Sequence, residues 1–241
     1  MKKIILGLAL LGSLAFGETE FQSQRKQFEQ NCEAGNIEAC GYAGAFYQAP
    51  TLFGGNASDR DYKKILYFYK KACDGNDYVA CSDLGAMYFD GKGGKKDYKK
   101  AVELFDKACD GGLAKNCNYL GTMYANGEGV KKDYKKAVEL YNKACDGKFE
   151  DGCNNLGTMY ANGKGVKMDM TRAMGYYRRA CDAGVWIACG NFASNLEADG
   201  DRARAVQYYQ KACEMDKKES PSSDYDKDLL REYCDKYDIL K

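Results

Sequence analysis

The sequence contains no histidine in 241 residues. Without an imidazole, the chain cannot build a Ser-His-Asp triad, a Cys-His pair or a histidine-ligated metal centre. A surplus of one charge is also lacking, because 36 Lys and Arg stand against 35 Asp and Glu. No basic excess is available to neutralise a phosphate backbone, so we expect no nucleic-acid partner. We also expect no cofactor and no metal site.

Hydrophobic runs of membrane-spanning length are lacking as well. The run Ile4–Phe16 follows two lysines and holds 13 residues, whereas a membrane span needs about 20. Ala15 and Gly17 then provide small residues at the two positions that a signal peptidase reads. The sequence therefore predicts a signal peptide over residues 1–17, no membrane span, and a secreted or periplasmic protein.

Cysteine, in contrast, is abundant, with twelve copies. An even number of cysteines in an exported chain predicts disulfides, and the missing histidine disfavours zinc. Ten of the cysteines stand in pairs eight positions apart. These pairs are Cys32 with Cys40, Cys73 with Cys81, Cys109 with Cys117, Cys145 with Cys153, and Cys181 with Cys189.

The spacing of each pair excludes a continuous helix. On one helix, Cys145 and Cys153 would lie about 12 Å apart along the axis, beyond the roughly 7 Å limit of a disulfide. The chain must therefore reverse between them, with Gly147 ending one helix and the next beginning near Glu150. Each pair is predicted to join the end of one hairpin to the start of the next, and by elimination Cys213 pairs with Cys234.

The cysteines also reveal a tandem repeat. Cys73, Cys109, Cys145 and Cys181 follow one another at intervals of 36 residues, which is typical of a stacked array. The predicted organisation is a signal peptide (1–17), an N-terminal capping helix (18–31), repeats at 32–72 with a loop insertion, 73–108, 109–144, 145–180 and 181–212, and a C-terminal capping helix (213–241).

Each repeat is predicted to hold two helices. In the third repeat, a first helix has its apolar face at i, i+3, i+4 and i+7. That face consists of Cys117, Leu120, Gly121 and Tyr124. Gly127 follows this helix, and Asp133 can cap a second helix. The second helix buries Ala137, Tyr141 and Ala144. Either helix buries only a stripe, so neighbouring hairpins must stack to complete a core.

These motifs carry a family resemblance. The pattern "LGTMY" followed by "AVELYNKA" resembles the tetratricopeptide repeat, and the four extra residues of the turn "GEGV" resemble the 36-residue Sel1-like repeat. With a cysteine pair in each unit, about residues 25–220 resemble the Helicobacter cysteine-rich protein family. The resemblance implies an all-α fold, an α/α-solenoid in which helix-turn-helix hairpins form a right-handed superhelix with a concave groove.

The resemblance also implies which side chains line that groove. In tetratricopeptide relatives the groove is lined from fixed positions of the first helix. The residues at these positions are Ser82, Asp90, Asn118, Thr122, Asn126, Asn154, Thr158 and Asn162. Amides and hydroxyls can hydrogen-bond a peptide backbone. Asn126 and Asn162 have an alternative role as helix C-caps before glycine, whereas Asn118 and Asn154 have none.

Two other motifs, the basic runs and an S-x-x-K match, are not taken as functional sites. The basic runs at 95–100 and 131–136 could contact an anionic surface, but they surround Asp97 and Asp133, and lysines beside a helix cap usually point into solvent. "SQRK", Ser23–Lys26, matches the S-x-x-K of serine β-lactamases, but S-D-N and K-T-G are missing. We therefore assign no catalytic residue.

The leading expectation is a monomeric, exported scaffold that binds a peptide or protein in its groove. Two alternatives stay open. The first is a penicillin-binding protein or weak β-lactamase, as some similar family members are, with a β-lactam or cell-wall peptide as ligand. The second is a purely structural component of the envelope.

Overall fold

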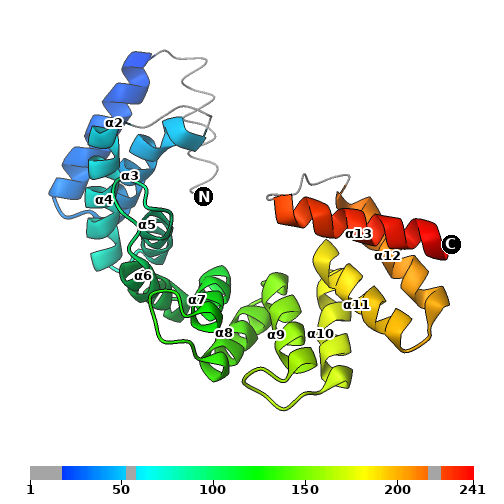
Figure 1. Cartoon of the computed structure of the whole chain (residues 1–241). Coiled ribbons are helices and arrows are strands. Elements are labelled where there is room, and N and C mark those ends of the chain that lie inside the picture. Colours follow the sequence, from blue (N-terminus) through cyan, green and yellow to red (C-terminus); the bar gives the residue numbers. More distant parts are fainter. Residues whose placement is uncertain (1–17, 53–57, 217–223) are drawn as a thin grey trace. The chain divides into compact units, whose positions relative to one another are not determined.

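The computed structural model describes residues 18–52, 58–216 and 224–241, and throughout these ranges the regular elements are α-helices (Figure 1). The helices are α2 (Glu18–Glu33), α3 (Ile37–Leu52), α4 (Asp59–Asp74), α5 (Tyr78–Asp90), α6 (Tyr98–Asp110), α7 (Ala114–Asn126), α8 (Tyr134–Asp146), α9 (Glu150–Asn162), α10 (Met170–Asp182), α11 (Trp186–Ala198), α12 (Arg202–Asp216) and α13 (Asp224–Leu240). The predicted signal peptide (1–17) lies outside the described residues. So do residues 53–57, which belong to the loop insertion predicted for the first repeat.

The helices form consecutive hairpins, and within each compact unit the helices pack on their neighbours in the chain. We call α3, α5, α7, α9 and α11 the A helices, and α4, α6, α8, α10 and α12 the B helices. The predicted α/α-solenoid of hairpins is confirmed. The chain forms two compact units, one containing α2 to α6 and the other α7 to α13. The handedness of a superhelix concerns the course of the whole chain and stays a prediction.

Helix ends follow the local chemistry of the sequence. The carboxylate of Asp133 accepts a hydrogen bond from the backbone N–H of Lys136 at 3.0 Å and caps α8, as expected. Gly147 is the C-cap of α8, and α9 begins at Glu150, also as expected. The left-handed conformation falls on Lys148, with φ of 63°, and not on Gly147. Gly147 is needed for another reason, because a Cβ there would lie 2.5 Å from that of Ala114.

The glycine of each "LG" pair lets the A helix approach its B helix closely. A Cβ on Gly121 would lie 2.8 Å from the ring of Tyr141, and one on Gly157 would lie 2.9 Å from the ring of Tyr177. Both tyrosines are almost fully buried. The contact explains why a glycine stands inside a helix, where it otherwise costs about 0.5–1 kcal/mol relative to alanine.

The disulfides join successive hairpins. Cys145 bonds Cys153 with a Cα–Cα distance of 4.6 Å, across the turn between α8 and α9. The pairs Cys32–Cys40, Cys73–Cys81, Cys181–Cys189 and Cys213–Cys234 are present as well. Cys109 and Cys117 are also disulfide-bonded. The described cysteines include no free thiol, and these five predicted pairings are confirmed.

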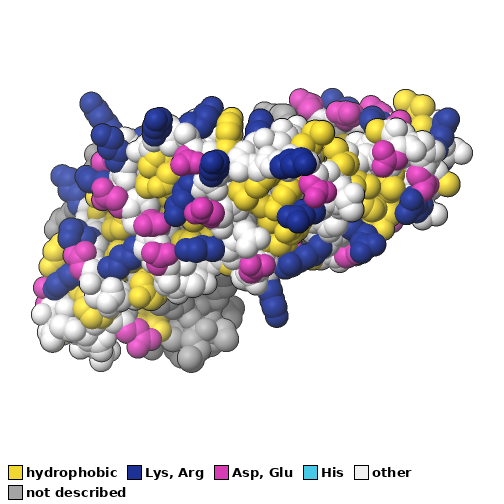
Figure 2. Space-filling model, turned by 90° about the horizontal axis from the view of Figure 1, so that it is seen from below, with side chains coloured by type: hydrophobic (Ala, Val, Ile, Leu, Met, Phe, Trp, Pro, Cys, Tyr) yellow, Lys and Arg dark blue, Asp and Glu magenta, His cyan; other side chains and the backbone are white. Residues whose placement is uncertain are grey.

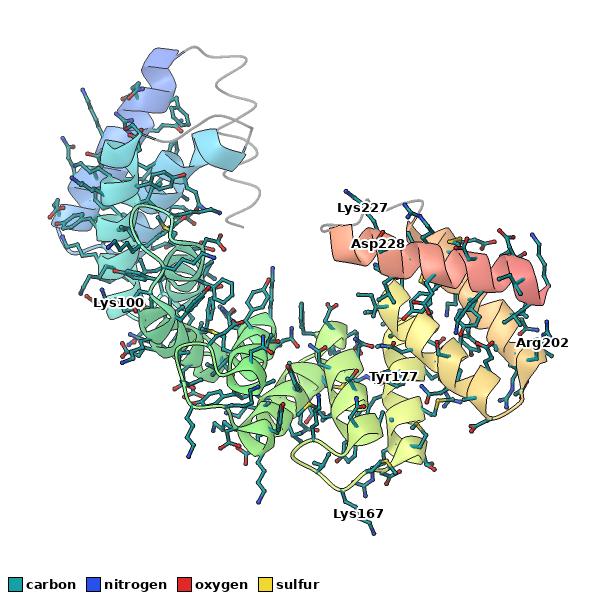
Figure 3. The ribbon with its side chains drawn as sticks, in the orientation of Figure 1. Lys100, Lys167, Tyr177, Arg202, Lys227 and Asp228 are labelled. Atoms are coloured by element: carbon teal, nitrogen blue, oxygen red, sulfur yellow. A yellow bond between two sulfur atoms is a disulfide. The ribbon has the colours of Figure 1, made fainter. Side chains whose placement is uncertain are left out.

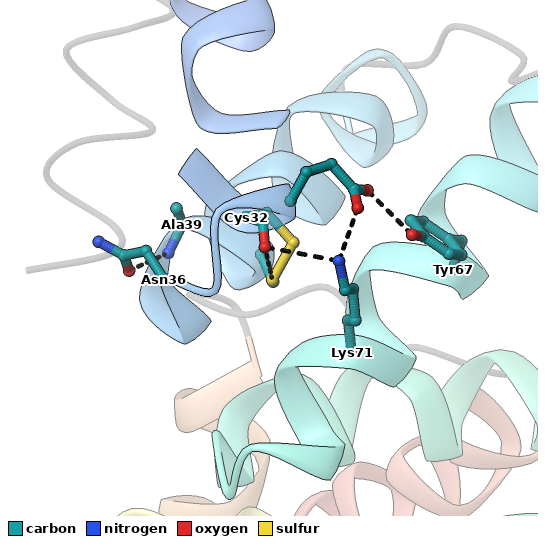
Figure 4. The surroundings of a disulfide bond; sticks show 7 residues. Cys32, Asn36, Ala39, Tyr67 and Lys71 are labelled. Carbon is teal, nitrogen blue, oxygen red and sulfur yellow. Dashed lines mark hydrogen bonds and ion pairs between the residues drawn. A yellow bond between two sulfur atoms is a disulfide. The ribbon is translucent and has the colours of Figure 1, made fainter. Parts of the chain in front are cut away.

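A basic side chain reinforces several of these junctions. Lys107 in α6 donates to the carbonyl oxygen of Cys73 at 2.7 Å, and Arg179 in α10 donates to that of Cys145 at 2.6 Å. Lys71 reaches Cys32 and also pairs with Glu33 at 2.7 Å (Figure 4). Each base stands two residues before a cysteine. Lys107 and Arg179 reach the end of the preceding B helix, and Lys71 reaches the end of α2. A cation is favourable there because the last carbonyls of a helix carry partial negative charge.

Candidate binding face of the A helices

Two asparagines hold equivalent places in consecutive repeats. Asn118 directly follows Cys117 in α7, and Asn154 directly follows Cys153 in α9. Their side chains are nearly buried, with 7% and 9% of their surface exposed. Buried amides must be hydrogen-bonded to avoid a desolvation penalty, so their partners decide what they can do.

Each of these asparagines is held by an asparagine of the next repeat. Asn155 Nδ2 donates to Asn118 Oδ1 at 2.8 Å, and Asn191 Nδ2 donates to Asn154 Oδ1 at 2.9 Å. The donors come from α9 and α11, the next A helix in each case. The result is a ladder of amides that runs along the A helices of the second compact unit.

The ladder ends at the C-terminal helix α13. The hydroxyl of Tyr233 donates to Asn191 Oδ1 at 3.3 Å. Gly190 makes room for this tyrosine, because a Cβ there would lie 2.0 Å from the ring. Gly190 stands where Asn118 and Asn154 stand in the two preceding repeats. In the final repeat, the ring of Tyr233 from α13 therefore occupies the space that an asparagine side chain takes in the two preceding repeats.

The ladder leaves one donor per repeat available. Within the described part of the chain, Nδ2 of Asn118 and Nδ2 of Asn154 have no hydrogen-bond partner in the protein, and neither is a fully buried atom. Since the Oδ1 atoms are held by Asn155 and Asn191, the orientation of both amides is set. Two oriented amide donors without a partner in the described part of the protein thus stand at the same position of successive repeats.

The predicted threonines lie beside these asparagines, and their hydroxyls are already engaged. Thr122 Oγ1 donates to the carbonyl of Asn118 at 3.2 Å and lies 3.2 Å from the hydroxyl of Tyr141. Thr158 repeats this arrangement with the carbonyl of Asn154 and with Tyr177, which is labelled in Figure 3. Burial raises the pKa of the Tyr177 hydroxyl, which therefore stays protonated and donates to Thr158.

The other predicted groove residues lie at helix ends or in α5. Asn126 and Asn162 are the exposed last residues of α7 and α9, and Asn162 Nδ2 donates to the carbonyl of Thr158 in its own helix at 2.9 Å. Ser82 is half-buried in α5, and Asp90 ends that helix and pairs with Lys92 at 3.1 Å. The last two belong to the first compact unit.

A charged cluster lies at the C-terminal end of the second unit. Tyr209 donates to Glu197 Oε2 at 2.8 Å, and the ammonium of Lys236 lies 3.1 Å from the same oxygen. Both contacts lower the pKa of Glu197, the tyrosine hydrogen bond being the larger cause. Because Lys236 comes from α13, the cluster ties the capping helix to α11 and α12.

The structure brings no reactive constellation around the S-x-x-K match. Ser23 and Lys26 lie on α2 with exposed side chains. Among the described residues, no hydrogen bond joins either side chain to a base. The residues described in the structure also include no group of three or more metal-ligating side chains and no helix long and apolar enough to cross a membrane.

Sequence reasoning missed the residues that complete the face. Asn155, Asn191 and Tyr233 were not among the predicted positions. Asn155 and Asn191 nevertheless orient the predicted amides of Asn118 and Asn154, and Tyr233 bonds Asn191. A signal was present, because Asn155 and Asn191 stand 36 residues apart, at one position of the repeat. Comparing successive repeats position by position would have found both.

Comparison with known families agrees with this architecture. The Sel1 repeat matches residues 51–77, 79–113, 117–149, 150–185 and 195–217, which is more than half of the chain. The chain belongs to the Sel1 repeat family. The 36-residue period, the glycine-rich turn and the hairpins therefore have one common explanation.

Solved Sel1-like structures show the same fold. The chain is 25% identical to c5321, a protective antigen of uropathogenic Escherichia coli, with a TM-score of 0.70, over 89% of this chain but only 48% of that one. It thus spans about half the length of that relative. A Sel1 repeat protein of Oxalobacter formigenes is 25% identical, with a TM-score of 0.68, over 86% of this chain and 84% of that chain.

The predicted resemblance to the Helicobacter cysteine-rich proteins is also confirmed. Helicobacter pylori cysteine rich protein B is 35% identical over 57% of this chain and 98% of that chain, with a TM-score of 0.45. No curated protein matches the sequence. The family is established by these findings, and the activity of this Sel1 repeat protein is a separate matter.

Proposed function

We propose that this Sel1 repeat protein binds an extended segment of a peptide or protein along its A helices. The observation that carries the proposal is the pair of oriented amide donors on Asn118 and Asn154. An extended peptide presents backbone carbonyl oxygens at regular intervals, and an N–H group can donate to any of them regardless of side chain. The face would therefore bind backbone, and neighbouring side chains would add selectivity.

The ladder supports the proposal in energetic terms. A free asparagine loses rotamer freedom when it binds a ligand, whereas the amides of Asn118 and Asn154 are already ordered by Asn155 and Asn191. Preorganisation of this kind lowers the entropic cost of binding. Thr122 and Thr158 belong to the proposed face through their remaining oxygen lone pairs. Asn126 and Asn162 extend the proposed face along the same two repeats. Ser82 and Asp90 are proposed as binding residues of the first compact unit.

A binding measurement with alanine variants tests the face. Selection from a displayed library of short unstructured peptides supplies the ligand. Asn118→Ala with Asn154→Ala removes two hydrogen bonds and should weaken binding by about 1–3 kcal/mol, at the usual net worth of each bond. Isothermal titration calorimetry measures the affinity, and circular dichroism should show unchanged helicity.

Two further variants separate a binding role from general damage. Asn142→Ala is the matched control, because Asn142 is exposed on α8 and bonds Asp146 of its own helix at 3.0 Å. Asn155→Ala keeps both donors but frees the amide of Asn118 to rotate, so a smaller loss is expected. The face is wrongly assigned if the double variant binds as tightly as Asn142→Ala.

We also propose that the protein is exported to the periplasm or beyond the cell and acts as a monomer. Every described cysteine is disulfide-bonded, which an oxidising compartment permits and a reducing cytosol opposes. N-terminal sequencing of the native protein should find a chain that begins after Gly17, and light scattering should give the mass of one chain. A start at Met1 in a cytosolic fraction would refute export.

The β-lactam alternative has no comparable support. Among the described residues, Ser23 makes no hydrogen bond to a base, and the sequence has neither of the two further motifs that serine β-lactamases need. Turnover of nitrocefin by the parent protein and by Ser23→Ala is the experiment that would revive it.

A further inference from the structure

Five lysines gather where the turn of one hairpin meets the preceding B helix. A Cβ on Gly165 would lie 2.3 Å from the carbonyl oxygen of Tyr134, so the turn between α9 and α10 lies directly on the start of α8. The ammonium groups of Lys132 and Lys164 lie 5.8 Å and 5.6 Å from the centre of the Tyr134 ring. We call the following residues the basic turn patch: Lys131, Lys132, Lys135, Lys164, Lys167 and Met168.

The lysines of this patch are unpaired. In the described part of the chain, none of their five ammonium groups has a carboxylate within ion-pair distance, and all five side chains are exposed. Several other lysines of the protein are paired, as Lys71 is with Glu33 and Lys236 is with Glu197. The carboxylates of Asp133 and Asp169 adjoin the patch and cap α8 and α10. The five ammonium groups outnumber these two carboxylates, so the patch carries a net positive charge in a chain of nearly balanced charge.

An apolar side chain stands in the same patch. Met168 follows Lys167 in the turn and is 65% exposed. Lys167 projects away from the turn between α9 and α10 in Figure 3. Figure 2, seen from that side, shows blue Lys and Arg side chains beside yellow hydrophobic ones, with magenta Asp and Glu side chains among them. Cations around a flexible apolar group are typical of surfaces that bind anionic membranes.

The chemistry of the cations also favours a diffuse anionic surface. Arginine recognises single carboxylates or phosphates with a planar fork, whereas lysine acts as a compact point charge on a flexible stem. All five bases of the patch are lysines. We propose that the basic turn patch docks this protein on an anionic lipid bilayer, with its lysines among the head groups and Met168 in the interface. The patch contains none of the residues of the proposed peptide-binding face.

Vesicle sedimentation of the native, disulfide-intact protein tests the proposal. Binding is expected to vesicles of phosphatidylglycerol mixed with phosphatidylcholine and not to phosphatidylcholine alone. Raising the salt from about 0.1 M to about 1 M shortens the Debye length from about 10 Å to about 3 Å and should release the protein. Lys131→Gln, Lys132→Gln and Lys164→Gln together should lower partitioning about a hundredfold, at about fivefold for each charge.

Met168→Gln keeps every charge and should lower partitioning about fivefold, through the lost apolar contact. A matched control removes three lysines outside the patch: Lys70→Gln, Lys115→Gln and Lys241→Gln. It should bind like the parent. Equal losses in both triple variants, or equal binding to neutral and anionic vesicles, would overturn the proposal. Capture by immobilised polyglutamate with no vesicle binding would also overturn it and indicate an acidic protein partner.

Discussion

At the scale of single residues, a hydroxyl of the A helix faces a tyrosine hydroxyl of the B helix in three successive repeats. Thr158 faces Tyr177 at 3.1 Å, and Ser194 faces Tyr209 at 2.9 Å. The second repeat has Ala86 and Phe105 at the equivalent places, so both hydroxyls are missing together. A hydroxyl on one side alone would leave a buried polar group unpaired, at about 1–3 kcal/mol. The repeats therefore differ in side chains but preserve hydrogen-bond satisfaction.

The same scale gives a test of the close approach between A and B helices. Gly157→Ala places a Cβ 2.9 Å from the buried ring of Tyr177. We expect a loss of about 1–3 kcal/mol in the free energy of unfolding, because the helices must separate or the ring must shift. Urea titration followed by circular dichroism measures the change.

Gly175→Ala is the control for that experiment. Gly175 is also a glycine inside a helix, but nothing lies within 4 Å of the Cβ that it would gain. The substitution should stabilise the protein by about 0.5–1 kcal/mol, since alanine restricts the unfolded chain. The packing argument fails if both substitutions change stability in the same direction.

At the scale of elements, α13 acts as the closing helix of the stack. It is held to α12 by the disulfide between Cys213 and Cys234, and Tyr233 ends the amide ladder. Lys236 adds the contact with Glu197 and Tyr209. A terminal helix of a repeat array must cover the core that no further repeat covers, and these three contacts supply that cover.

The contact at Glu197 makes the attachment of α13 sensitive to pH. The hydrogen bond from Tyr209, and then the contact with Lys236, hold the pKa of Glu197 below its ordinary 4.5. A lowered pKa in the folded state stabilises the fold above pH 4.5, and this contribution is lost as the pH falls through the folded value. Because a third of each side chain is exposed, we expect about 0.5–1 kcal/mol.

Urea titrations of the parent and of Glu197→Gln at neutral pH and below pH 4.5 measure this contribution. The parent should lose more stability on acidification than the variant, by the amount assigned to Glu197. Glu103→Gln is a matched control on the exposed surface of α6 and should keep the parent's pH dependence. Identical acid losses in parent and Glu197→Gln would show that this carboxylate is not coupled to folding.

At the scale of the whole molecule, stability is the sum of small contacts between neighbouring hairpins. Within each compact unit, a helix packs chiefly on the helices next to it in the chain, as expected for a solenoid. Disulfides and basic side chains lie at the junctions between hairpins, where a stack of short helices would otherwise open. Removing the contacts at one junction should therefore destabilise mainly the two hairpins that meet there.

Removing one disulfide tests this local behaviour. Cys145→Ala with Cys153→Ala should cost about 2–4 kcal/mol and increase hydrogen exchange mainly in α8 and α9. The matched variant Cys181→Ala with Cys189→Ala should shift the increase to α10 and α11. Hydrogen exchange measured by mass spectrometry distinguishes the two. A uniform increase along the chain in both variants would mean that the stack unfolds as one cooperative unit.

Much of the fold could be predicted because its determinants are local. The Asp133 cap, the helix end at Gly147 and the disulfide between Cys145 and Cys153 each depend on residues at most eight positions apart. Short segments meet few competing arrangements, and the repetition of one motif at 36-residue intervals confirmed each reading several times over. The family followed from the same local signals.

The hydrogen-bonding state of the candidate face was decided by the tertiary structure. The sequence placed Asn118 and Asn154 at one position of the repeat, but not the partners of their amide oxygens. Those partners, Asn155 and Asn191, are each 37 residues away and meet them only because successive A helices pack side by side. Likewise, the lysines at 131–136 gain their neighbours from the next turn only through the close approach of Gly165. Contacts between repeats depend on side-chain direction and packing distance, which no local pattern specifies.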